Sequence, residues 1–119
     1  MQHRRQSFQH VAKPWGEEIL VEHTAVYALK DIRMKRGTRS SLQMHEKKHE
    51  TIYVISGTVE LETHAAGCVE LEIFGPNEAY SIPPGTKHRV RVLEHCRLIE
   101  VSTPELDDVV RFEDDYQRA

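Results

Sequence analysis

Short runs in which apolar and polar residues alternate recur along almost the whole chain. In residues 58–62, Val59 and Leu61 alternate with glutamates, which is typical of an antiparallel strand with one buried face. No stretch has the apolar spacing of an amphipathic helix between capping residues. The pattern therefore predicts strands at residues 18–21, 27–32, 51–55, 58–62, 69–73, 80–82, 88–92 and 97–101.

Glycine and proline turns separate these runs, so the chain is expected to form one all-β domain, a sandwich or a barrel, of roughly eight to ten strands. Closure into a barrel would remove exposed strand edges. The length of 119 residues fits a single domain. Residues 1–12 are polar and are expected to form an N-terminal arm, frayed or lying along a sheet edge, before a domain of residues 13–119.

Charge and composition argue against some classes of binding partner. A net charge of −3 argues against binding to nucleic acid, which needs a basic surplus. No apolar run approaches the roughly 18 residues that span a bilayer, and no secretory signal is recognisable, so a cytoplasmic protein with reduced cysteines is expected, a structural disulfide being the lesser alternative. Seven basic residues lie between positions 30 and 48, which suits either a small anion or a solvated strand face.

Residues 45–49 match the HExxH motif of zinc proteases. That motif needs a helix, because positions i and i+4 must share one face. The β-branched and aromatic run at residues 51–55 follows at once, and Gly37 and two serines precede it, which favours strands and turns. The protease interpretation is therefore set aside, and His49 is expected on the surface.

A second spacing from residue 37 to residue 57, Gly-x5-Gln-x-His-x4-Glu-x6-Gly, suits a different site. Gln43 and His45 would share one strand face, and Glu50 would open the next strand beside them. His88 could complete the set from a distant strand. Two imidazoles, a carboxylate and an amide oxygen would hold a divalent metal, Zn²⁺, Mn²⁺, Co²⁺ or Fe²⁺, with positions open for substrate. The alternative is a barrel that has lost its metal.

This spacing, followed by Pro-x-Gly-x2-His at residues 83–88, resembles the two motifs of the cupin superfamily, with Gln43 in place of the usual first His. More closely, the chain resembles the isomerase domain of type II mannose-6-phosphate isomerases, which usually follows a mannose-1-phosphate guanylyltransferase domain. A chain of this size fits the isomerase domain alone. The resemblance implies a cupin fold, a double-stranded β-helix or jelly-roll barrel. The stretches that carry the closer resemblance are residues 13–16, 41–45, 82–89 and 110–118.

The chain departs from the family pattern at several positions. Asn77 and Val92 stand where the second cupin motif has Gly and Asn, and both positions concern turns more than ligands. Lys48 stands where the family commonly has Arg. Residues 105–108 lack a glycine of the family, and Gln117 replaces another.

The resemblance implies a metal-dependent aldose–ketose isomerase that interconverts mannose 6-phosphate and fructose 6-phosphate through a cis-enediol, and it suggests a homodimer. A carboxylate, Glu100 first and Glu50 second, would move the C2 proton while the metal polarises the substrate oxygens. Glu100 lies in an apolar strand; facing inward it would have a raised pKa, and facing outward it would be an ordinary surface charge.

Three cations are candidates for the anionic parts of the substrate. Arg111 belongs to an Arg-Phe-Glu-Asp stretch of the family and could pair with a phosphate through two N–H donors. Lys48 and Lys87 could face a phosphate or an enediolate, or could equally be loop cations. Two other functions stay open: a sugar- or metabolite-binding cupin without catalysis, and a small Fe(II) oxygenase.

Overall fold

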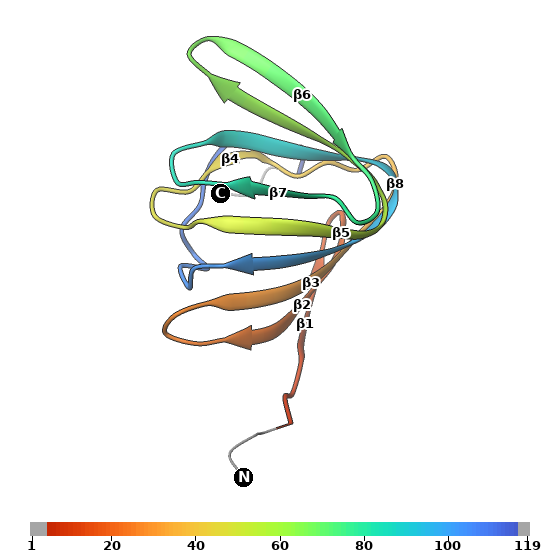
Figure 1. The fold of residues 1–119 in the computed structure, drawn as a ribbon, viewed down its shortest axis with the longest axis vertical. Coiled ribbons are helices and arrows are strands. Elements are labelled where there is room, and N and C mark those ends of the chain that lie inside the picture. Colours follow the sequence, from red (N-terminus) through yellow and green to blue (C-terminus); the bar gives the residue numbers. More distant parts are fainter. Residues whose placement is uncertain (1–4, 117–119) are drawn as a thin grey trace.

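The structure is a computed structural model that describes residues 5–116, and it is built from strands, turns and loops (Figure 1). Within these residues there is no helix, and so no helix that could cross a membrane. The all-β fold predicted from the alternating pattern is confirmed. The strands in this range are β1 (Gln9–Lys13), β2 (Gly16–His23), β3 (Ala28–Met34), β4 (Leu42–Met44), β5 (Glu50–Ala65), β6 (Cys68–Phe74), β7 (Ala79–Ile82), β8 (Lys87–Ser102) and β9 (Val110–Glu113).

Two strands are much longer than the sequence pattern predicts. β5 and β8 each have 16 residues, and each joins two runs that were expected to be separate strands. The register of β5 against β8 shifts around Gly57, whose φ of 84° is a left-handed conformation that glycine adopts readily. Such an irregularity bends a strand without ending it, so β5 passes from one part of the sheet to another.

The strand pairing makes the sheet curl on itself. β8 lies between β3 and β4 in the order β1-β2-β3-β8-β4-β9, while β5 pairs with β6, β7 and β8, and every pairing is antiparallel. Because β8 pairs with β5 along most of its length and with β3 and β4 at its two ends, the sheet surrounds an interior (Figure 1). The hairpin of β5 and β6 lies at one end of the molecule, and β1, β2 and β3 lie at the other.

The interior face carries the apolar half of each alternating run. Val54, Val59 and Val92 are almost completely buried, and Leu61 and Trp15 belong to the same core cluster. The predicted inward orientation of Val59 and Leu61 is thereby confirmed. Burial of these side chains stabilises the fold by about 1.5–3 kcal/mol for each large aliphatic residue. Both cysteines are free thiols.

Part of the expected N-terminal arm forms a strand at the edge of the sheet. Val11 lies opposite Glu18 in the antiparallel pair of β1 and β2, and this pairing begins at Gln9. Residues 1–4 and 117–119, which include part of the expected arm and part of the family's C-terminal stretch, lie outside the described residues. The division into residues 1–12 and 13–119 stays a prediction.

Candidate active site

A cavity of about 170 Å³ lies in the interior of the curled sheet. Loop residues and residues of β1, β2, β3, β4, β5, β7, β8 and β9 line it, so the strand pairing described above assembles it. The cavity contains most of the residues singled out from the sequence. Those that line it are Gln43, His45, Lys48, Glu50, His88, Glu100 and Arg111.

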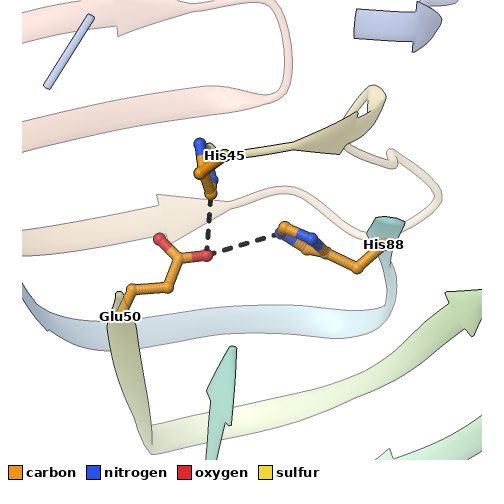
Figure 2. A group of neighbouring side chains, drawn as sticks. All are labelled: His45, Glu50 and His88. Atoms are coloured by element: carbon orange, nitrogen blue, oxygen red, sulfur yellow. Dashed lines mark ion pairs between the residues drawn. The ribbon is translucent and has the colours of Figure 1, made fainter. Parts of the chain in front are cut away.

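Three buried side chains with metal-ligating atoms converge at this cavity (Figure 2). His45 directly follows β4, Glu50 is the first residue of β5, and His88 is the second residue of β8. The Oε1 atom of Glu50 lies 3.7 Å from Nε2 of His45 and 3.4 Å from Nε2 of His88. One ligand atom from each residue lies within 4.8 Å of the others. The fold thus brings together three residues that were selected from their sequence spacing, each from a different part of the chain.

Backbone carbonyls determine which ring nitrogens face Glu50. Nδ1 of His45 donates to the carbonyl of Asp108 at 2.5 Å, and Nδ1 of His88 donates to the carbonyl of Thr86 at 2.8 Å. A carbonyl oxygen can only accept, so each Nδ1 must carry its proton. In the neutral rings both Nε2 lone pairs therefore face the carboxylate. Three acceptors that point to one place fit a divalent cation.

The charges around Glu50 support the same interpretation. Burial alone would raise the pKa of Glu50, but the neighbouring rings of His45 and His88 and the charge of Lys48 hold that pKa well below its ordinary value of 4.5. Burial would lower the pKa of His45, yet Glu50 and the Asp108 carbonyl outweigh burial and raise it. Glu50 is therefore an anion that favours a positive charge beside it, either a proton on the imidazole or a bound cation.

Gln43, the fourth predicted ligand, lies next to the three residues. Its Cα is the cross-strand partner of His88 in β8 and of Arg111 in β9. Directly paired residues of antiparallel strands project to the same face of a sheet, and all three line the cavity. The role of Gln43 as a ligand stays a prediction.

Beside the three residues lies a second set of buried charges. Nζ of Lys48 lies 3.1 Å from Glu50 and 3.2 Å from Glu100, and all three side chains are less than one tenth exposed. Glu100 thus faces the interior, the first of the two orientations considered from the sequence. Burial raises the pKa of Glu100 to about 7, with a further rise from the Glu50 charge and opposition from Lys48 and Lys30.

Two predicted cations lie in different surroundings. Arg111 in β9 lines the cavity. Lys87, the first residue of β8, places its Nζ 4.4 Å from the centre of the Phe112 ring and is not among the cavity-lining residues. Neighbouring strand residues project to opposite faces, so the inward position of His88 directs Lys87 outward.

The cavity wall also contains a charged group that was not predicted from the sequence. Lys30 in β3 lies 3.3 Å from Glu18 in β2, and Lys13 lies 3.9 Å from the same carboxylate. All three line the cavity together with Tyr80, whose pKa burial raises well above 10.0. The alternating pattern of β3 could have indicated this group, because Lys30 falls on the strand face shared by apolar core residues of β3.

An all-β sheet curled around a His-Glu-His cluster has the cupin fold, and solved structures share this fold. KdgF from Halomonas sp. has a TM-score of 0.72 at 24% identity, covering 85% of this chain and 90% of that chain. Oxalate decarboxylase from Bacillus subtilis has a TM-score of 0.78 at 17% identity, covering 88% and 30%. Another structure of that decarboxylase is named for its Mn(II) centers. These likenesses establish the fold.

The family follows from sequence comparison. The family described as mannose-6-phosphate isomerase C-terminal matches residues 1–114, and the chain belongs to this family. Mannose-1-phosphate guanylyltransferase ManC of Salmonella typhimurium is 36% identical over 98% of this chain, and xanthan biosynthesis protein XanB of Xanthomonas campestris is 35% identical over 91%. The chain spans 24% and 23% of these relatives, about a quarter of their length.

Proposed function

We propose that this protein is a metal-dependent aldose–ketose isomerase that interconverts mannose 6-phosphate and fructose 6-phosphate. The observation that carries the proposal is the buried convergence of His45, Glu50 and His88 beside the Lys48–Glu100 ion pair. Membership in the mannose-6-phosphate isomerase C-terminal family supports the choice of substrate.

His45, Glu50 and His88 would hold the metal, with Gln43 as a fourth ligand. When bound, a divalent metal supplies Lewis-acid polarisation of the substrate oxygens at C1 and C2. The mixed nitrogen and oxygen donors suit Zn²⁺, Mn²⁺, Co²⁺ or Fe²⁺. The Mn(II) centers named for a structural relative make Mn²⁺ the first to test.

Glu100 is the proposed proton carrier. Its carboxylate takes the proton from C2 of the aldose, and the electron pair of that C–H bond becomes the C1–C2 double bond of the cis-enediol. Glu100 then returns the proton to C1, while the hydroxyl proton moves from O2 to O1. The ketose is therefore formed with no net gain or loss of protons. A carboxyl group with a pKa of about 7 suits a residue that must both accept and release a proton.

Lys48 and Arg111 are the residues proposed to stabilise the negative charges of the substrate and of the enediolate. Lys48 lies 3.2 Å from Glu100 and is buried, so its ammonium group can stabilise the enediolate in a medium that screens charge poorly. Arg111 lines the same cavity and has the guanidinium geometry that pairs with a phosphate. Lys87 lies outside the cavity lining, and we assign it no step. The homodimer and the cytoplasmic location stay predictions.

The double variant His45→Ala/His88→Ala tests the proposal. It removes both imidazoles, so we expect metal binding and isomerisation to be lost together, measured by titration with Mn²⁺ and by the formation of fructose 6-phosphate. His95→Ala is the matched control, because His95 is exposed in β8 and lies outside the cavity lining. Isomerase activity that persists in the double variant in metal-free buffer would remove the metal from the reaction.

A further inference from the structure

One acidic residue of the loop between β8 and β9 holds the loop that carries His45 and Lys48. The Asp108 carboxylate accepts three consecutive backbone amides, from Glu46 at 3.0 Å, Lys47 at 2.7 Å and Lys48 at 2.9 Å. Consecutive amides that point to one place form a concave anion site, here filled from within the chain. These hydrogen bonds lower the pKa of Asp108, so the carboxylate is an anion at neutral pH.

The backbone of the same residue contacts the cluster of His45, Glu50 and His88. The Asp108 carbonyl accepts the hydrogen bond from Nδ1 of His45, the bond that leaves Nε2 facing Glu50. The carboxylate and the carbonyl of one residue therefore act on the same loop. The first holds the loop backbone, and the second sets the ring orientation and tautomer of His45.

Other contacts to this loop come from neighbouring segments. The amide of His49 donates to Oγ1 of Thr103 at 3.0 Å, and the amide of Thr103 donates to the carbonyl of His49 at 3.0 Å. The amide of Gly85 donates to the carbonyl of His45 at 2.8 Å. These bonds hold the two ends of the loop, whereas the amides of its three central residues are held by Asp108.

We propose that Asp108 is a positioning residue of the site, which keeps Nε2 of His45 turned toward Glu50 and keeps Lys48 beside Glu100. The proposal rests on the proposed function for its chemical meaning. Without the carboxylate, the loop loses the anion that orders its amides, and the Asp108 carbonyl is no longer held against the His45 ring. Loss of such an outer partner lowers metal affinity by about 10- to 100-fold.

The test uses three variants of the full chain. Asp108→Ala removes the acceptor for all three amides, and Asp108→Asn keeps one oxygen that can still accept. Asp107→Asn is the matched control, because Asp107 is exposed and loses the same charge one residue away. Titration with Co²⁺, followed by its visible spectrum, should give a loss of about 10- to 100-fold for the Ala variant, a smaller loss for the Asn variant, and wild-type binding for the control.

A second readout needs no metal. Nitrogen-15 NMR of the ring reports the tautomer of His45 in the metal-free protein. Wild type should carry the proton on Nδ1, and Asp108→Ala should lose that preference while circular dichroism shows that the fold is kept. If the Ala variant does not fold, the Asn variant carries the comparison, with a partial change in both readouts.

The outcomes separate the two proposals. Wild-type Co²⁺ affinity and spectrum in a folded Asp108→Ala, with the His45 tautomer unchanged, would overturn the positioning role. Should the wild-type chain bind no Co²⁺, the metal in the proposed function fails, and the tautomer of His45 decides the positioning role alone.

Discussion

Glu100 is buried in the middle of the sheet, between Lys30 of β3 and Ile52 of β5 in the strand register. Its partner Lys48 lies in a loop, and both line the cavity. The Glu100 carboxylate does not belong to the cluster of His45, Glu50 and His88, and it is not a surface charge. Its proposed use is the movement of a proton.

The variant Glu100→Gln tests this use at the scale of one residue. It keeps the size of the side chain and removes the proton acceptor, so kcat should fall by about 10²- to 10⁴-fold. The affinity for Mn²⁺ should stay near that of wild type, because the His45, Glu50 and His88 ligands remain. Glu94→Gln, an exposed change in the same strand, is the control. A kcat within about threefold of wild type would assign the proton transfer elsewhere.

At the scale of elements, the bend in β5 is what lets one strand serve two parts of the sheet. A Cβ atom at Gly57 would lie 2.3 Å from the carbonyl oxygen of His95 and 2.6 Å from Cα of Cys96. Both neighbours are backbone atoms of β8, and they cannot move aside without disturbing the longest pairing in the fold. The bend therefore depends on glycine for its conformation and for its lack of a side chain.

Gly57→Ala should lower the free energy of unfolding by about 3 kcal/mol, or prevent folding, since strain and steric overlap act together. Gly67→Ala provides the comparison, because Gly67 also has a left-handed φ, of 79°, but no atom within 4 Å of the added Cβ. That change should lower the free energy of unfolding by about 1 kcal/mol, because alanine adopts a left-handed φ less readily than glycine. Urea denaturation measures both, and equal losses would contradict the role given to the close approach.

A charge pair across β3 and β8 makes stability depend on pH. Nη2 of Arg97 lies 2.9 Å from Asp31. Burial would raise the pKa of Asp31, but the hydrogen bonds and charges of Arg97 and Arg33 outweigh it, and the pKa lies below 3.8. The pair therefore stabilises the fold above pH 3.8, and this contribution is lost as the pH falls through the lower pKa of the folded state.

Asp31→Asn should for this reason be less stable than wild type at neutral pH, with a difference that shrinks on acidification below the ordinary pKa of Asp31. Thermal unfolding followed at several pH values measures it. A difference that stays constant, or grows toward acid, would show that Asp31 stabilises the strand pair without its charge. Arg97 is nearly half exposed, so the effect should be reduced by salt.

At the scale of the whole molecule, alternation was enough to predict an all-β domain, and the spacing of His45, Glu50 and His88 predicted a cluster that the structure brings together. Asn77, which departs from the motif glycine, adopts a left-handed φ of 67°, so the turn is kept. Such features depend on local pattern and on motifs. They can be read before the register of any strand is known.

Other features depend on which distant residues meet. The contact of Asp108 with residues 46–48 joins positions some sixty apart in the chain, and nothing in either segment indicates the other. The joining of four predicted runs into β5 and β8 required the bend at Gly57 and the pairing between the two strands. Neither short-range pattern nor residue type determines such contacts, which follow from the closure of the sheet.

Turnover of mannose 6-phosphate is the most direct test of a metal-dependent isomerase site in this protein. The protein is stripped of metal with a chelator, reloaded with Mn²⁺, Zn²⁺, Co²⁺ or Fe²⁺, and fructose 6-phosphate is measured at each stage. We expect product with at least one metal, none after stripping, and none from the His45→Ala/His88→Ala variant. Thermal stabilisation by mannose 6-phosphate with no product under any metal would contradict this expectation and would indicate a binding protein instead.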